Sequence, residues 1–132
     1  MVKLMKGEKG FTLIEVVIAI AILGIIAAAF MAALAGASRA IFVADERATA
    51  ESLARSQMED VKELDYADNY TASIPLDYVT AGYSANISAQ RWDAINHAVS
   101  ANETGIQKIT VTVGHNSKPA VITLVDYKAR RY

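Results

Sequence analysis

The chain has 132 residues, with 13 Lys and Arg, 14 Asp and Glu, and a formal net charge of −1. This length suits one domain with an additional segment and excludes two full-sized domains. Cysteine is absent, which excludes a disulfide framework and thiol chemistry. The stability of any small domain must therefore come from its own core, from packing on a helix elsewhere in the chain or from neighbouring subunits.

The apolar residues concentrate between Phe11 and Gly36, where Glu15 is the only charged side chain. A helix rises about 1.5 Å per residue, so residues 11–36 reach about 39 Å and exceed a hydrocarbon core of about 30 Å. We therefore predict a membrane-spanning helix over 11–36. The ten residues before it carry three lysines and one glutamate, at Lys3, Lys6, Lys9 and Glu8.

This basic segment predicts the orientation of the chain. By the positive-inside rule the N-terminus stays in the cytoplasm, and everything after Arg39 crosses to the periplasm or the cell exterior. We expect a single-pass protein of the inner (cytoplasmic) membrane, in contact with lipid. The alternative is a cleaved secretory signal peptide with a small-residue site at Gly36-Ala37-Ser38. Such peptides have an apolar region of roughly 7–15 residues, shorter than this one.

The most specific pattern is Gly10-Phe11-Thr12-Leu13-Ile14-Glu15, at the junction of the basic segment and the apolar run. It resembles the processing site of type IV pilins and type II secretion pseudopilins, and the resemblance covers residues 1 to about 36. It implies that residues 1–10 are a leader peptide, that a prepilin peptidase cuts between Gly10 and Phe11, and that the new amino terminus of Phe11 is methylated. It also implies a structural subunit that assembles with other pilin or pseudopilin subunits on an inner-membrane assembly platform.

Glu15 also stands out on physical grounds, because an ionised carboxylate in hydrocarbon costs several kcal/mol and marks a functional candidate. After cleavage, Phe11 would carry an ammonium group, and the Glu15 of one subunit could pair with the amino terminus of another. Such pairing offsets two desolvation penalties, and removal of one partner leaves a buried charge. In the uncut chain, Glu15 could instead reach the interface. Thr12 is a candidate donor near this assembly site, or a simple helix cap.

Two departures from the pattern of major pilins favour a minor subunit. Many major pilins have a proline at the position that Ala32 occupies in this chain. Without that proline, the helix should be straighter than the helix of a major pilin. The region after the helix is short and lacks the cysteine pair common among Gram-negative pilins.

The helix should continue beyond the membrane, because residues 37–64 contain no Gly or Pro and are rich in strong helix formers. Apolar residues recur at three- and four-residue steps, which predicts one buried stripe: Val43, Ala50, Leu53, Ala54, Met58, Val61 and Leu64. The charged residues of the other face should be mostly solvated: Glu46, Arg47, Glu51, Arg55, Glu59, Lys62 and Glu63.

Residues 65–82 contain many turn formers and read as a loop. Its aspartates raise the question of calcium, although no spacing matches a calcium-loop template. Strands are expected at 83–92, 109–113 and 121–127, with an irregular or helical excursion over 93–102 and a hairpin loop over 114–119. The prediction is an α+β fold, a long N-terminal helix packed on a small antiparallel sheet of about three strands, with residues 37–132 forming the head.

This order of elements is similar, over about residues 50–127, to the smallest (I-type) minor pseudopilins and to V-type minor pilins. Trp92 is expected to be a core or interface anchor, and the face around Trp92 and the 109–113 strand is a candidate interface. His97 and His115 read as isolated imidazoles in polar loops, so no metal site is expected. No cofactor is implied.

The alternative functions are a pilin-like component of a DNA-uptake, competence or adhesion apparatus with a ligand-binding head, and an enzyme. Direct nucleic-acid binding is not expected. Residues 65–132 hold six acidic residues and six Lys or Arg residues, and only Lys128, Arg130 and Arg131 cluster, as a solvated tail would. No catalytic residues are identified, because the sequence offers no nucleophile–base pair, metal set or phosphate loop.

Overall fold

A computed structural model describes residues 10–131 of the chain. These residues divide into two compact units, one ending at Ile41 and one beginning at Phe42. The unit that ends at Ile41 is a single helical segment, whereas the second unit contains a sheet and the hydrophobic core. The boundary lies within the first helix, five residues beyond the end of the predicted membrane segment.

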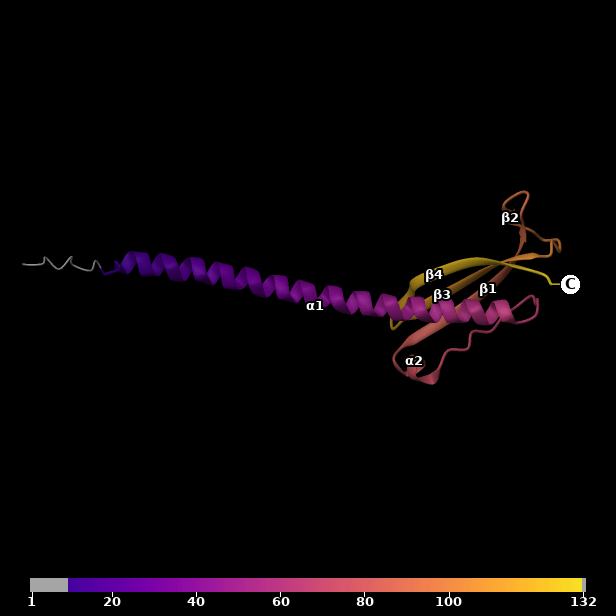
Figure 1. Ribbon diagram of the computed structural model, residues 1–132, viewed down its shortest axis with the longest axis horizontal. Coiled ribbons are helices and arrows are strands. Elements are labelled where there is room, and N and C mark those ends of the chain that lie inside the picture. Colours follow the sequence, from indigo (N-terminus) through magenta and orange to yellow (C-terminus); the bar gives the residue numbers. More distant parts are fainter. Residues whose placement is uncertain (1–9, 132) are drawn as a thin grey trace, which may run out of the picture. The chain divides into compact units, whose positions relative to one another are not determined.

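Helix α1 (Leu13–Glu63) is 51 residues long and contributes to both units (Figure 1). No proline interrupts it, and Gly24 and Gly36 both remain helical. Position 32 is alanine, which donates its backbone N–H within the helix as proline could not. The prediction of one helix that continues from the apolar run into the head is confirmed.

The buried stripe of α1 is shorter than predicted, and it includes a polar residue. Its members follow three- and four-residue steps within the second unit: Ala50, Leu53, Ala54, Gln57, Met58 and Val61. Val43 and Leu64 were wrongly assigned to the stripe, since they are 58% and 55% exposed. Val43 lies seven residues before the first buried position, and Leu64 follows the last helical residue, so neither is covered.

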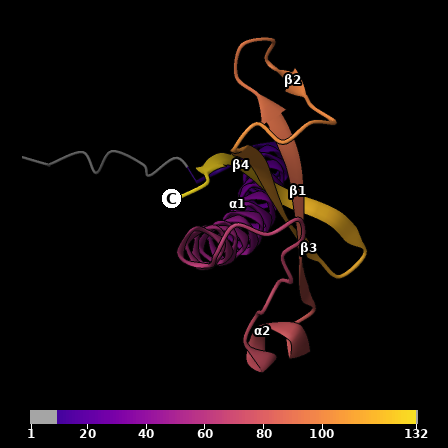
Figure 2. The ribbon, with the colours of Figure 1, turned by 90° about the vertical axis from the view of Figure 1, so that its right-hand side faces the viewer.

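Four strands form one antiparallel sheet in the order β2-β1-β3-β4. They are β1 (Tyr83–Asp93), β2 (Ala98–Val99), β3 (Ile106–His115) and β4 (Lys118–Ala129). The α+β prediction is confirmed. The fourth strand is the two-residue β2, which pairs with the end of β1 in the region expected to be an irregular excursion. Figure 2 shows the sheet beside α1, with β2 and the short helix α2 (Leu76–Thr80) at opposite ends of the view.

The core lies between α1 and one face of the sheet. Ile109, Val111 and Val113 of β3 are at most 1% exposed and belong to the same cluster as the buried stripe of α1. Burial of one such side chain contributes roughly 1.5–3 kcal/mol, so this row is the main attachment of the helix to the sheet. Intervening residues such as Thr110 and Thr112 are only half-buried and belong to the other face.

The β3–β4 hairpin is tighter than predicted. A loop was expected over 114–119, but the strands extend to His115 and Lys118 and leave only Asn116 and Ser117 between them. Asn116 adopts a positive φ of 52°, which Asn tolerates. The register shifts between Val113 and His115, and a Cβ on Gly114 would lie 2.8 Å from the carbonyl oxygen of Lys118. Glycine therefore permits the close approach of the two strands that makes this turn short.

The segment between α1 and β1 was predicted as a loop, and it also contains α2. The Gln57 side chain of α1 holds this segment through two hydrogen bonds to the backbone of Ser73. Its Nε2 donates to the carbonyl oxygen at 2.8 Å, and its Oε1 accepts from the N–H at 2.8 Å. Tyr70 enters the core and donates to Gln107 Oε1 at 3.1 Å. These bonds fix one side of the segment against the second unit.

Candidate functional site

The N-terminal motif lies where the described chain enters α1. Gly10, Phe11 and Thr12 precede the first helical residue, Leu13, and all three are exposed. A Cβ placed on Gly10 would meet nothing within 4 Å. The Gly10–Phe11 peptide bond therefore lies in exposed, non-helical backbone. The predicted leader peptide, residues 1–10, lies outside the described residues except for Gly10.

Thr12 is the cap of α1. Its Oγ1 accepts a hydrogen bond from the Glu15 N–H at 3.3 Å, and its carbonyl oxygen accepts from the Val16 N–H at 3.2 Å. A threonine cap of this kind contributes about 0.5–2 kcal/mol to a helix. The carboxylate of Glu15 lies in the first turn, where the helix dipole favours negative charge. Thr12 and Glu15 are thus brought together by the start of the helix itself.

Glu15 is an exposed acidic residue among apolar neighbours. It lines a shallow hollow of about 390 Å³ with five apolar side chains: Phe11, Val16, Ala19, Ile20 and Leu23. Within residues 10–131, the side-chain hydrogen bonds and ion pairs do not include this carboxylate. The hollow runs along the helix surface, so a neighbouring helix could cover it and exclude water from the carboxylate.

The apolar half of α1 is long enough and hydrophobic enough to cross a membrane. An 18-residue window within the helix has a mean hydropathy of 2.9, and none of it is buried within the chain. The exposed side chains there include Ile22, Leu23 and Phe30. So much exposed apolar surface requires lipid or other apolar helices around it.

Trp92 lies on the solvent-facing side of the sheet, not in the core. Trp92 is half-buried, and its ring centroid lies 5.5 Å from the ring centroid of Tyr127. Lys108 Nζ lies 5.1 Å from the Trp92 ring centroid. These three residues come from β1, β4 and β3. Trp92 and the Ile109–Val113 segment were expected to share one candidate interface. That grouping is wrong, because the apolar side chains of the segment point into the core.

His115 is not an isolated loop residue, and Glu46 is not solvated, so both predictions are corrected. His115 Nδ1 lies 2.7 Å from Glu46 Oε1, and Lys118 Nζ donates to Glu46 Oε2 at 2.7 Å. The bonds from Lys118 and then His115 hold the pKa of Glu46 below its ordinary value. The long hairpin strands bring His115 and Lys118 to Glu46 of α1, which the predicted loop could not do. His97 is exposed in the turn between β1 and β2, with a positive φ of 50°.

One aspartate of the α1–β1 segment, Asp68, and the more distant Glu103 pair with the same arginine. Arg91 Nη2 donates to Asp68 at 3.0 Å and Arg91 Nε lies 3.6 Å from Glu103. Tyr66 donates to Glu103 at 2.8 Å, and burial followed by this bond raises the pKa of Tyr66 to about 12. Over residues 10–131 no three His, Cys, Asp or Glu side chains gather as metal ligands. The geometry gives no support to a calcium site.

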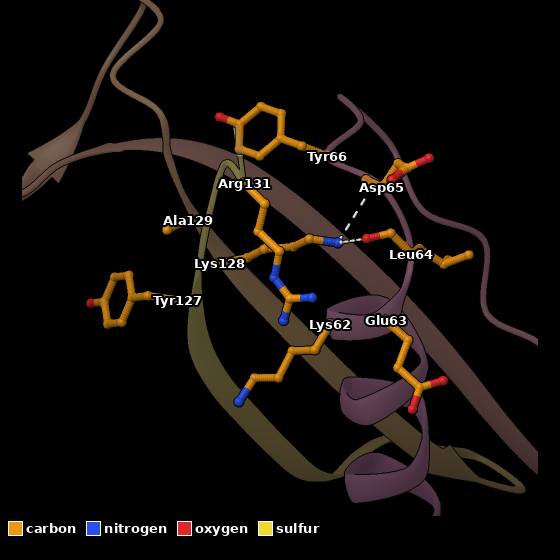
Figure 3. Close-up of a pocket in the computed structure, with 9 residues that line it drawn as sticks. All are labelled: Lys62, Glu63, Leu64, Asp65, Tyr66, Tyr127, Lys128, Ala129 and Arg131. Carbon is orange, nitrogen blue, oxygen red and sulfur yellow. Dashed lines mark hydrogen bonds between the residues drawn. The ribbon is translucent and has the colours of Figure 1, made fainter.

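Lys128 is buried and does not belong to a solvated tail, so that part of the prediction is wrong, whereas Arg130 and Arg131 are exposed as expected. Its Nζ donates to the carbonyl oxygens of Val61, Leu64 and Asp65, which are the last acceptors of α1 and the residues that follow it. Figure 3 shows this ammonium group reaching from β4 to Leu64 and Asp65, beside a hollow of about 320 Å³. This role of Lys128 was not predicted, because the sequence around a strand lysine does not show which face of the sheet it occupies.

Two further basic side chains of this region also have internal partners. Lys62 pairs with Asp126, and the Arg130 guanidinium lies 5.0 Å from the centroid of the Tyr66 ring. These contacts leave less of the positive charge available for phosphate groups.

The structural role of Gln57 was not predicted either. Its only signal in the sequence is a polar residue at a position of the apolar stripe.

Comparison with protein families gives one match. Residues 5–31 match the prokaryotic N-terminal methylation motif, which is about a fifth of the chain. The match includes Gly10, Phe11, Thr12 and Glu15, the residues assembled at the start of α1. Comparisons with curated proteins and with solved structures give no significant match.

Proposed function

We propose that this chain, which carries the signature of type IV pilins and pseudopilins at residues 5–31, is a membrane-anchored structural subunit of a type IV pilus or a type II secretion pseudopilus. A prepilin peptidase removes residues 1–10 and methylates Phe11. Residues 11–36 then cross the inner membrane and later serve as the polymerisation helix, with the N-terminus on the cytoplasmic side. Residues 37–132 form the head, outside the cytoplasm.

The observation that carries this proposal is the arrangement of the motif around the helix start. The Gly10–Phe11 bond lies in exposed, non-helical backbone, two residues before α1 begins. Directly after it comes a capped helix whose apolar surface is uncovered over the whole span. Cleavage therefore creates a new amino terminus at the end of a helix that can exchange lipid for neighbouring helices.

Glu15 supplies a physical reason for ordered assembly. Its carboxylate lies among apolar side chains, where an unpaired charge is costly. After cleavage, the amino group of Phe11 in an adjacent subunit could approach this carboxylate, with Thr12 nearby as a hydrogen-bonding group. A pair of opposite charges in a desolvated setting fixes one position of two helices relative to each other, because any other position leaves both charges unpaired.

A minor rank within the fibre is the finer part of the proposal. It is supported by Ala32, which keeps α1 continuous at the position where the family's major subunits commonly have proline. The order of elements expected from the sequence over about residues 50–127, which resembles that of I-type and V-type subunits, points the same way. A minor subunit needs specific neighbours. The solvent-facing cluster of Trp92, Lys108 and Tyr127, here called the outer aromatic cluster, is our candidate contact with a partner head.

The test of processing is the intact mass of protein extracted from membranes. We expect a chain that begins at Phe11 and carries one added methyl group. Gly10→Val should leave the leader attached, since a branched side chain crowds the peptidase site. Gly36→Val is the matched control, because a Cβ at Gly36 meets nothing within 4 Å. A mature chain that begins near Ser38, or one that keeps residues 1–10, would contradict the proposal.

Rank is tested separately, by quantifying subunits in sheared fibres. A minor subunit should be present at a small fraction of the dominant pilin. Equal abundance would show a major subunit while leaving the processing result intact.

A further inference from the structure

His115 is the meeting point of four elements at one end of the head. It is the last residue of β3, and its ring stacks on Tyr83 of β1 with centroids 4.3 Å apart. Nδ1 faces Glu46 of α1 at 2.7 Å. The same carboxylate is bonded by Lys118 of β4. The side chains of His115 and Glu46 are only 21% and 14% exposed, so water does not readily replace these contacts.

The other ring nitrogen faces two groups of opposite hydrogen-bonding character. Nε2 lies 3.1 Å from the carbonyl oxygen of Ala81, which can only accept a hydrogen bond. It also lies 3.1 Å from Nδ2 of Asn116, which can only donate one. A single nitrogen cannot satisfy both at the same time. It accepts when it has a lone pair and donates when it has a proton.

The proton count of the ring therefore selects the partner. In the neutral ring, Nδ1–H donates to the ionised Glu46, and Nε2 accepts from Asn116 within the β3–β4 hairpin. In the imidazolium, Nδ1–H still donates to Glu46, but Nε2–H donates to Ala81 in the turn between α2 and β1. Addition of one proton thus transfers one bond of the ring from the hairpin to a different segment.

The surroundings hold both alternative partners in place. The Asn116 N–H donates to the Gly82 carbonyl oxygen at 2.8 Å, and a Cβ on Gly82 would lie 2.3 Å from Asn116 Oδ1. The Asn116 amide is therefore packed against a glycine that adopts a positive φ of 91°. The charged or titratable groups around the ring are Glu46 and Asp45 from α1, Lys118 from β4 and Tyr83 from β1.

We propose that His115 is a proton-operated latch: its ring bonds Glu46 of α1 in both states, and it bonds Ala81 only when protonated, which adds a second link between the hairpin and the α2–β1 turn beside the Asn116–Gly82 backbone bond. Histidine is the side-chain type that ordinarily changes charge between about pH 5 and 8. The inference rests on the geometry of the head alone and does not depend on the proposed function.

The experiment follows Asn116 and His115 by NMR in the full chain, isotope-labelled and held in detergent micelles, from about pH 5 to 8. We expect the side-chain amide signals of Asn116 and the carbonyl carbon signal of Ala81 to shift with the same midpoint as the His115 ring signals. An Asn116 amide that stays in place while His115 titrates would overturn the latch.

Two variants separate the latch from general effects of pH. His115→Gln should abolish both shifts, because glutamine does not titrate, and an otherwise retained backbone spectrum shows that the head remains folded. His97→Gln, at the exposed histidine of the β1–β2 turn, should leave both shifts unchanged. Shifts that persist in His115→Gln, or that vanish in a folded His97→Gln, would contradict the proposal.

Discussion

Trp92 and Ile109 lie on opposite faces of the same sheet. Ile109 pairs in register with Ala89 and is 1% exposed against α1, whereas Trp92 contacts Lys108 and Tyr127 on the solvent side. The two residues were expected to share one surface. Since neighbouring residues of a strand point to opposite faces, the register decides which of them serves the core and which can meet a partner.

The first prediction follows from this separation. Ile109→Ala should destabilise the head by about 2–5 kcal/mol, because it opens a cavity in the core. Trp92→Ala should cost clearly less, since the ring is only half-buried, yet it should weaken association with a partner head. Chemical denaturation followed by circular dichroism, with a pull-down of co-expressed pilin-like subunits, measures both. A Trp92 variant that unfolds as readily as the Ile109 variant would remove the outer aromatic cluster as a contact surface.

The second prediction concerns the buried lysine at the end of α1. Lys128→Met keeps the apolar stem of the side chain but removes the donors to Val61, Leu64 and Asp65. The carbonyl oxygens then lack their partner, which should cost about 1–3 kcal/mol of stability. Thermal unfolding of the detergent-solubilised chain measures the loss. Arg131→Met, at an exposed position beside the same hollow, is the control and should leave the unfolding temperature nearly unchanged.

The third prediction concerns acid. The hydrogen bond from Lys62, followed by that from the Tyr127 N–H, lowers the pKa of Asp126 below its ordinary value of 3.8. A lowered pKa in the folded state means that the contribution to stability is present above about pH 4 and is lost as the pH falls through the folded value. Both side chains are more than one-third exposed, so the effect should be modest and weaken with salt.

Asp126→Asn should therefore flatten the loss of stability between about pH 4 and 2, as measured by urea midpoints at a series of pH values. Asp77→Asn, in the short helix α2, is a control without an ion pair in the described residues. An unchanged acid profile for Asp126→Asn would show that the Lys62 pair contributes nothing to the folded state.

The fourth prediction tests Glu15. Glu15→Ala should leave cleavage after Gly10 intact, because the peptide bond lies outside the helix, but should reduce incorporation into fibres strongly. Glu15→Asp should be milder, since it keeps the charge. Glu59→Ala, on the exposed face of α1 in the head, is the matched control. Immunoblots of sheared fibres against membrane-retained protein give the ratio, and normal incorporation of Glu15→Ala would remove the ion-pair argument.

The sequence by itself determined the long helix, the three longer strands and the motif at the start of the helix. The reason is that these features are local. Each of them depends on residues that are close together in the chain. They are the length of the apolar run, the alternation of Ile109, Val111 and Val113, and the three- and four-residue steps of Ala50, Leu53, Ala54, Met58 and Val61. The Gly10–Glu15 pattern is local too, and its match to a family model covers the same residues.

Only the tertiary structure decided which polar side chains have partners inside the head. Gln57 and Ser73 are 16 residues apart in the chain, Lys128 and Val61 are 67 apart, and His115 and Glu46 are 69 apart. A polar residue on a helix or strand looks the same in sequence whether it faces water or a distant backbone. Its role depends on the strand register and on the shortness of the β3–β4 turn, and these are set by packing between segments that no local pattern connects.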